Sequence, residues 1–133
     1  PRAVELMTLP PERAPEYLFH DPTSQIVQDF FRLPDDPDLI PKIIAALVWA
    51  QGCGAKFLWP IPEHGLAKRL HRVQTPTLII FGREDRVIPS VYGGEFARLI
   101  GGSRLELIDD CGHIPQVEKL ERTKEIVQEF LRV

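Results

Sequence analysis

Two short apolar runs in the second half of the chain are separated by a segment with helical spacing. Thr77–Phe81 is almost uninterrupted in its apolar character, which is typical of a strand buried on both faces of a parallel sheet. Apolar and polar residues alternate along Arg104–Ile108, which predicts a strand near a sheet edge with one wetter face. Between them, Ser90–Ile100 has its large apolar residues on one side, which predicts a helix that Gly101 and Gly102 end. The pattern therefore predicts a strand–helix–strand unit with parallel strands.

The remaining apolar positions also recur at helical spacing. Glu118–Val133 should be a terminal helix packed on one face of the sheet, and Leu66–Val73 should be a short helix before the first strand. Pro1–His20 has no clear period, and we expect it to be irregular with one helical turn near Glu16–Phe19. A helix should follow it, with Asp21 as its N-cap and Pro22 at its first position, and end at Leu33-Pro34.

A further helix should begin at Asp36-Pro37-Asp38 and stop at Gly52. It carries a broad apolar stripe, so we expect Ile43, Ile44, Leu47 and Val48 to be largely buried. Two interpretations of these helices are open. They only pack on the main domain, or they also cover an active site in it. The apolar, proline-rich run Phe57–Pro62 should link them to the main domain, with Trp59 either near the pocket or in plain interdomain packing.

Ionisable residues follow both predicted strands. Glu84 and Asp85 come directly after the first strand, and Asp109, Asp110, Cys111 and His113 follow the second. Because the carboxyl ends of parallel strands meet at one edge of a sheet, an acid and a histidine should face the same crevice. Other interpretations are a turn or cap role for Asp85 and an ordinary loop role for His113. A metal site is disfavoured, because these ligands are too adjacent in sequence to surround an ion.

These residues carry a resemblance to the α/β-hydrolase superfamily, strongest over Leu66–Val133. The matching residues are Pro76–Asp85, Pro89, Gly112-His113-Ile114-Pro115 and Glu118. The resemblance is greatest to capped members such as meta-cleavage-product hydrolases, lactonases and esterases. Their triad runs in the order nucleophile, acid, histidine.

The resemblance implies an α/β fold in which residues 66–133 form the C-terminal part of the core, with the last two parallel strands and flanking helices. Residues 1–65 would form a helical cap. Asp85 would be the triad acid and His113 the base. Val87, Ile88, Trp59 and Ile114 would contact the substrate. No cofactor is implied.

One part of the family pattern is not found in this sequence, namely the nucleophile motif G-x-S-x-G. Ser24, Ser90 and Ser103 all lack the flanking glycines, and the early strands and oxyanion-hole loop are also missing. The chain begins at Pro1 rather than Met. We therefore expect an N-terminal hydrolase half, on the same or another chain, as a partner. We also expect these 133 residues alone to be neither stably folded nor active.

Two classes of function follow. The first is a hydrolase of ester or C–C bonds that acts on a small molecule with an apolar part. Epoxide hydrolases and dehalogenases, which use an aspartate nucleophile, are alternatives; the former present cap tyrosines, and this cap has only Tyr17. The second class is a non-catalytic binding or scaffold protein of the same fold. A nucleophile elbow in the N-terminal sequence would favour the enzyme.

Composition limits the classes of partner and the compartment that we expect for this chain. The net charge of −3 implies neither nucleic acid nor an anionic membrane, and no run approaches the length of a membrane span. Nothing at the N-terminus resembles a signal peptide. Cys53 and Cys111 do not make a disulfide framework and indicate a reducing, cytoplasmic compartment. A homo-oligomer is compatible with these features.

Overall fold

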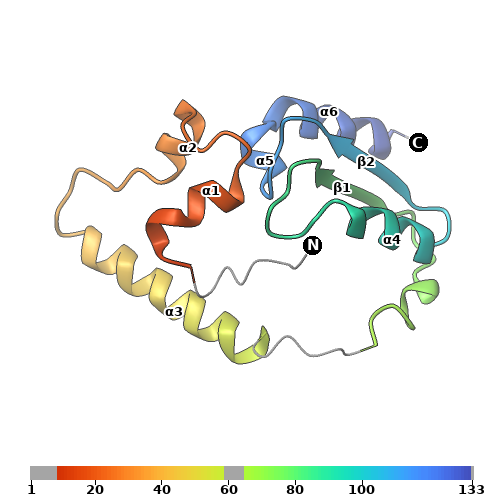
Figure 1. Ribbon diagram of the computed structural model, residues 1–133, viewed down its shortest axis with the longest axis horizontal. Coiled ribbons are helices and arrows are strands. Elements are labelled where there is room, and N and C mark those ends of the chain that lie inside the picture. The colour runs from red at the N-terminus through yellow and green to blue at the C-terminus, as the bar shows by residue number, and fades with distance from the viewer. Residues whose placement is uncertain (1–8, 59–64, 133) are drawn as a thin grey trace.

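The computed structural model describes residues 9–58 and 65–132. Figure 1 shows a small sheet with flanking helices and, beside it, a long helix that lies apart from the sheet. The elements along the chain are η2 (Pro11–Arg13), α1 (Ala14–Leu18), α2 (Gln25–Phe30), α3 (Ile40–Leu58), η3 (Leu70–Arg72), β1 (Leu78–Gly82), α4 (Val91–Leu99), β2 (Arg104–Ile108), α5 (Pro115–Glu118) and α6 (Leu120–Leu131). No helix among the described residues combines the length and apolar character that crossing a membrane requires.

β1 and β2 form the predicted parallel pair. Leu78 pairs with Arg104 and Gly82 with Ile108, so the two strands start and end together. β2 has the expected bounds, and β1 is shifted by one residue from the predicted Thr77–Phe81. Because the carboxyl ends are level, the two loops that follow leave the sheet side by side (Figure 1).

Both faces of this pair are covered by helices. Successive side chains of a strand point to opposite faces. Phe81 and Leu105 lie against Gly93 of α4, where an added Cβ would be 3.0 and 3.1 Å from their side chains. Leu78 and Ile80 instead pack on a core cluster that contains Ile108, Cys111 and Ile126, the last of these from α6. Both faces of the first strand therefore pack against helices, but only Ile79 and Gly82 are buried and its other residues are half-buried, so the prediction of full burial is met in part.

The terminal helix is divided into two parts. We expected one helix over Glu118–Val133, but α5 ends at Glu118 and α6 begins at Leu120. Pro115 stands in the first turn of α5, a position where the missing N–H of proline costs nothing. Lys119 between the two helices has a non-helical backbone, with φ −130° and ψ 52°. This break places the side chain of Glu118 against the loop that follows β2, where it binds Gly112.

The N-terminal part packs around Phe19, which is fully buried. The rings of Phe30 and Phe31 meet it edge-on, with centroids 5.6 and 6.0 Å away. The predicted start of α2 was wrong: the helix begins at Gln25, with Ser24 as its N-cap. Asp21 forms a turn instead, because its Oδ1 accepts hydrogen bonds from both the N–H and the hydroxyl of Thr23.

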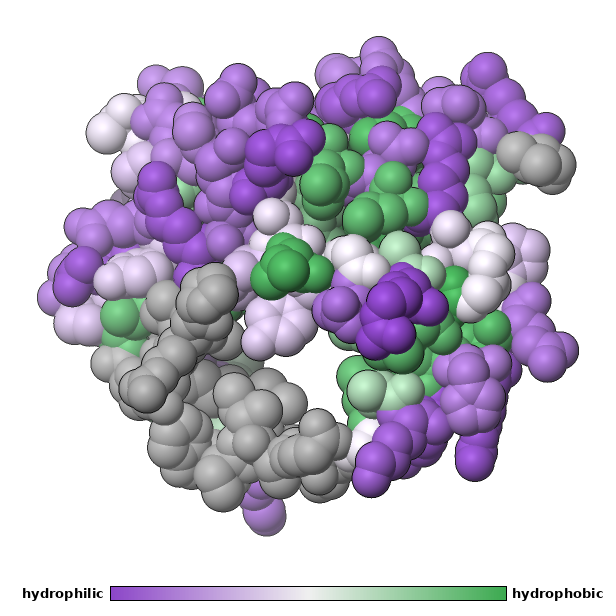
Figure 2. Space-filling model, turned by 45° about the vertical axis from the view of Figure 1, so that its right-hand side comes forward, coloured by the Kyte–Doolittle hydropathy of each residue, from purple (hydrophilic) through white to green (hydrophobic). Residues whose placement is uncertain are grey.

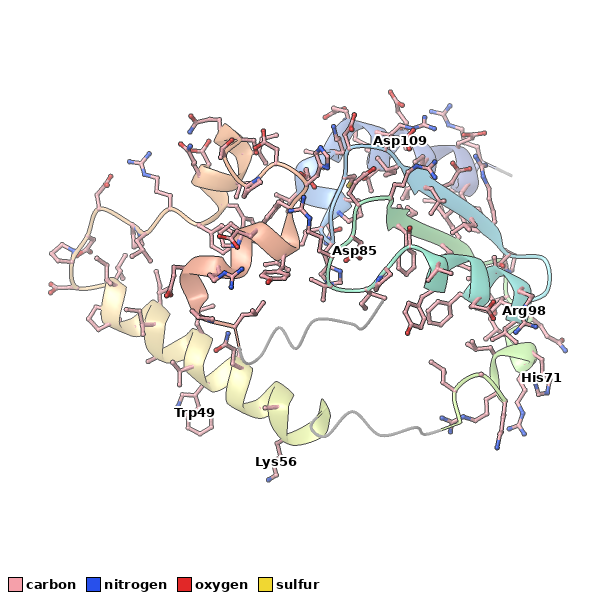
Figure 3. The ribbon with its side chains drawn as sticks, in the orientation of Figure 1. Trp49, Lys56, His71, Asp85, Arg98 and Asp109 are labelled. Carbon is pink, nitrogen blue, oxygen red and sulfur yellow. The ribbon has the colours of Figure 1, made fainter. Side chains whose placement is uncertain are left out.

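The predicted end and burial of the long helix were also wrong. α3 continues through Gly52 to Leu58. Glycine ends a helix where it adopts a positive φ, and the only described glycines that do so are Gly65 and Gly102. Ile44, Leu47 and Val48 are exposed, the last to 62%. The reason is that α3 stands away from the sheet (Figure 1), and Trp49 and Lys56 point away from the rest of the molecule (Figure 3).

The helix expected over Leu66–Val73 is reduced to the single turn η3, with Leu66 exposed. Lys68 and Arg72 are four residues apart, and Arg69 and Arg72 are three apart, so a full helix would stack like charges on one face. A helix this short also has little intrinsic stability in water. The basic side chains lie on an exposed turn.

Candidate active site

Asp85 and His113 lie within hydrogen-bonding distance at the carboxyl ends of β1 and β2. Asp85 follows β1, His113 follows β2, and His113 Nδ1 is 2.9 Å from Asp85 Oδ2. In Figure 3 Asp85 stands in the loop after β1, facing α1. The acid and the histidine that the sequence predicts to face one crevice are therefore hydrogen-bonded to each other. This bond brings together residues that are 28 positions apart in the chain.

The Asp85 carboxylate is buried, with its side chain 4% exposed. Its Oδ1 accepts hydrogen bonds from the backbone N–H groups of Val87 and Ile88, both at 2.8 Å. Burying a charge is tolerated where hydrogen bonds replace those of water. Asp85 thus stabilises the turn before α4 with one oxygen, and its second oxygen lies within hydrogen-bonding distance of His113.

The two strand-end loops approach each other closely at Gly82. A Cβ at this position would overlap the backbone carbonyl oxygens of Cys111 and Gly112. Backbone hydrogen bonds from Arg83 to Ile108 (2.9 Å) and from Glu84 to Cys111 (3.1 Å) join the loops. Gly82 is therefore the residue that lets the loop carrying the acid lie against the loop carrying the histidine.

The other acidic residues of these loops are engaged elsewhere. Glu84, which directly precedes Asp85 in the same loop, accepts a hydrogen bond from the Cys111 N–H at 3.1 Å. Asp109 forms an ion pair with Arg83, and Asp110 lies 3.8 Å from His20 Nε2. Within the described parts of the chain, no group of three or more His, Cys, Asp or Glu side chains is placed to hold a metal ion.

The thiol of Cys111 is fully buried beside these carboxylates. Burial raises its pKa to about 12, and the negative charge of Glu118 adds to this effect. A thiol with this pKa stays protonated near neutral pH, and the thiolate is the nucleophilic form. Cys111 is therefore a buried packing residue of the site and not a nucleophile.

The second imidazole nitrogen of His113 is available. The His113 side chain is 31% exposed, and Nε2 has no hydrogen-bond partner among the described residues. A base held at Nδ1 and accessible at Nε2 is suited to exchanging a proton with a bound molecule.

The residues that we expected to contact a substrate differ in exposure. Val87 is 7% exposed and presents little surface, whereas Ile88 is 38% exposed and Ile114 is half-buried. Trp59 lies outside the described residues. A cavity of about 560 Å³ lies nearby, lined by His20, Asp21, Pro22, Ser24, Ile26, Asp110, Glu118 and Lys119. Neither Asp85 nor His113 lines it.

Sequence reasoning missed the contribution of the segment around α1. The N–H of His113 donates to the Leu18 carbonyl oxygen at 2.8 Å, and Arg86 Nη1 donates to the Glu16 carbonyl oxygen at 2.7 Å. Both bonds use backbone acceptors, which leave no trace in the residue pattern. The loops that carry the acid and the histidine therefore both rest on this segment, and the bond between Arg86 and Glu16 joins residues 70 positions apart.

Residues 49–120 match the family described as the alpha/beta hydrolase fold. The chain belongs to this family. It is 33% identical over 73 residues to a 2-hydroxy-6-oxo-6-phenylhexa-2,4-dienoate hydrolase of Comamonas testosteroni. It is 40% identical over 70 residues to a 2-hydroxy-6-oxononadienedioate/2-hydroxy-6-oxononatrienedioate hydrolase of Klebsiella pneumoniae. These matches cover 55% and 53% of this chain but only 26% and 24% of the two relatives.

The fold is similar to solved hydrolase structures over a longer part of the chain. A 2-hydroxy-6-oxo-6-phenylhexa-2,4-dienoate hydrolase from Rhodococcus sp. strain RHA1 superposes with a TM-score of 0.57. The similarity covers 91% of this chain and 43% of that one, at 23% sequence identity. At this level of identity the likeness concerns the fold alone, and it confirms the α/β-hydrolase architecture.

Proposed function

We propose that this chain supplies the acid and the base of a hydrolase, with Asp85 as the acid and His113 as the base. The hydrogen bond of 2.9 Å between His113 Nδ1 and the buried Asp85 carboxylate carries this proposal. A carboxylate bonded to one imidazole nitrogen fixes the tautomer and stabilises the imidazolium that forms during reaction. The two backbone bonds to Asp85 hold that carboxylate in place.

The proton path follows from this arrangement. With Nδ1–H donating to Asp85, His113 Nε2 carries a lone pair and faces away from the acid. It takes the proton of the attacking hydroxyl group or water and later returns it to the leaving group. Asp85 stays ionised throughout and stabilises the positive charge on the imidazole.

The nucleophile is proposed to come from an N-terminal hydrolase half, on the same or another chain. Two observations support this. Nε2 has no partner among the described residues, and β1, within those residues, pairs with β2 alone. An apolar strand with an open edge is a site where another strand adds. In this arrangement residues 1–65 would be the cap and residues 66–133 the C-terminal part of the core.

The bond that is cleaved is proposed to be an ester or a C–C bond in a small molecule with an apolar part. Relatives named as hydrolases of 2-hydroxy-6-oxo-dienoates favour C–C cleavage next to a ketone. Ile88 and Ile114 provide apolar surface near His113. We propose Val87, Ile88, Trp59 and Ile114 as substrate contacts.

The test uses the complete protein that carries this chain. It would be assayed with a 2-hydroxy-6-oxo-6-phenylhexa-2,4-dienoate and with p-nitrophenyl butyrate, because the two substrates separate C–C from ester cleavage. Turnover of either substrate, lost in His113→Ala, is the expected result. Binding of the dienoate without turnover of either substrate would contradict the proposal and favour the non-catalytic binding protein.

A further inference from the structure

Glu118, at the end of α5, accepts three backbone hydrogen bonds with its two carboxylate oxygens. Oε1 accepts from the N–H groups of His20 (2.8 Å) and Asp21 (3.1 Å), and Oε2 accepts from the N–H of Gly112 (2.6 Å). Its side chain forms no ion pair with a lysine, arginine or histidine in the described part of the chain. The negative charge of Glu118 is therefore stabilised by backbone N–H groups, which it holds in place.

These three bonds join two segments that are far apart in the sequence. His20 and Asp21 follow α1, whereas Gly112 directly precedes His113. A fourth bond, from the His113 N–H to the Leu18 carbonyl oxygen, lies beside them. The segments also touch at Gly112, where a Cβ would be only 2.7 Å from the Leu18 oxygen and 2.8 Å from Phe19 Cα. The backbone before the imidazole is thus fixed on two sides.

We propose that Glu118 is a positioning residue for His113: it holds the Gly112–His113 backbone against the Leu18–Asp21 segment and so directs the imidazole toward Asp85. The effect on catalysis rests on the hydrolase function proposed above. The 2.9 Å hydrogen bond to Asp85 depends on where the His113 backbone lies, because the imidazole reaches only a short distance from its Cα. Small displacements of a catalytic group are costly to the rate.

The chemistry of the three bonds requires a carboxylate. Among the described residues, the three backbone partners of Glu118 are all N–H donors that occupy both oxygens, and the Cys111 thiol also interacts with this carboxylate. A glutamine would turn its NH₂ group toward at least one N–H group, leaving a donor facing a donor. Glu84 offers the matched control, since in the described part of the chain only its Oε2 accepts a hydrogen bond, from the neighbouring Cys111 N–H. The amide oxygen of a glutamine at position 84 can accept that bond.

The experiment compares Glu118→Gln with Glu84→Gln in the complete protein. In Glu118→Gln we expect kcat to fall about 10²-fold with KM nearly unchanged. The downfield proton resonance of His113 Nδ1–H should broaden or disappear. Glu84→Gln should keep both the rate and the resonance. The inference is overturned if Glu118→Gln retains the sharp resonance, or if the two variants lose kcat equally.

The resonance also separates this inference from the proposed function, because it needs no turnover. A protein without hydrolase activity can still show the effect of Glu118 on His113. If Glu118→Gln does not fold, amide hydrogen exchange in the unaltered protein tests the inference instead. The amide hydrogens of His20, Asp21 and Gly112 should exchange slowly and with similar protection factors, since one carboxylate holds all three. Fast exchange of any one of them would refute the inference.

Discussion

At the scale of single residues, Gly82 controls how closely the two functional loops approach. A Cβ there would overlap the carbonyl oxygens of Cys111 and Gly112, which are backbone atoms with little freedom to move. We expect Gly82→Ala to lower the free energy of unfolding by about 1–3 kcal/mol, as overpacking does. The hydrogen bond between Asp85 and His113 should weaken with it. Urea denaturation of the complete protein measures the first effect.

Gly94 is the control for this substitution. It lies in α4, and a Cβ there would meet nothing within 4 Å. Alanine in an exposed helix is favoured over glycine by about 1 kcal/mol, so Gly94→Ala should leave the protein as stable or more stable. Equal destabilisation by the two substitutions would mean that the close approach at Gly82 does not matter.

The residues of the site were predictable to different degrees. Asp85 and His113 could be found from the sequence, because each follows an apolar strand and parallel strands bring their ends together. The role of Glu118 could not be found this way. Its three partners are backbone N–H groups, two of them 97 and 98 residues away, and no periodicity records such a contact.

At the scale of elements, the strands were predicted well, because burial determines which of their residues are apolar. The helices were predicted less well, because the interactions that determine where a helix ends are weaker. β2 matches its prediction, whereas α3 passes through Gly52 and the helix over Leu66–Val73 is only one turn. Glycine lowers helix stability without ending a helix unless its φ becomes positive. The apolar spacing over Leu66–Val73 favours a helix, whereas repulsion among Lys68, Arg69 and Arg72 disfavours it. Both features are visible in the sequence, and the sequence alone does not show which is stronger.

The exposed apolar face of α3 makes the proposed cap testable. Ile44, Leu47 and Val48 are exposed here, and we propose that they cover the site in the complete protein. Ile44→Asp should then raise KM for a substrate with an apolar part, because a charge would line its path. Steady-state kinetics with p-nitrophenyl butyrate measures this. Lys56→Asp, on the same helix but pointing away from the rest of the molecule (Figure 3), should leave KM unchanged. Unchanged KM in both variants would contradict the cap.

At the scale of the whole molecule, much apolar surface is open. Figure 2 shows green patches between polar side chains on the viewed face, and the exposed large apolar residues include Trp49, Val91 and Leu131. Sheets of two strands are at best marginally stable. We therefore expect Pro1–Val133 expressed alone to show no cooperative thermal transition and no ester turnover. A sharp melt together with turnover that requires His113 would contradict this expectation.

Asp85 and His113 are proposed to act together as the acid and base of a hydrolase, and the rates of three variants of the complete protein test this proposal. His113→Ala and Asp85→Asn should each lower kcat by about 10⁴-fold, because the tautomer and the proton acceptor are lost. His71→Ala, an exposed histidine on η3 at the far side of the molecule (Figure 3), should keep the full rate. Turnover that persists in His113→Ala at the level of His71→Ala would show that His113 is not the catalytic base.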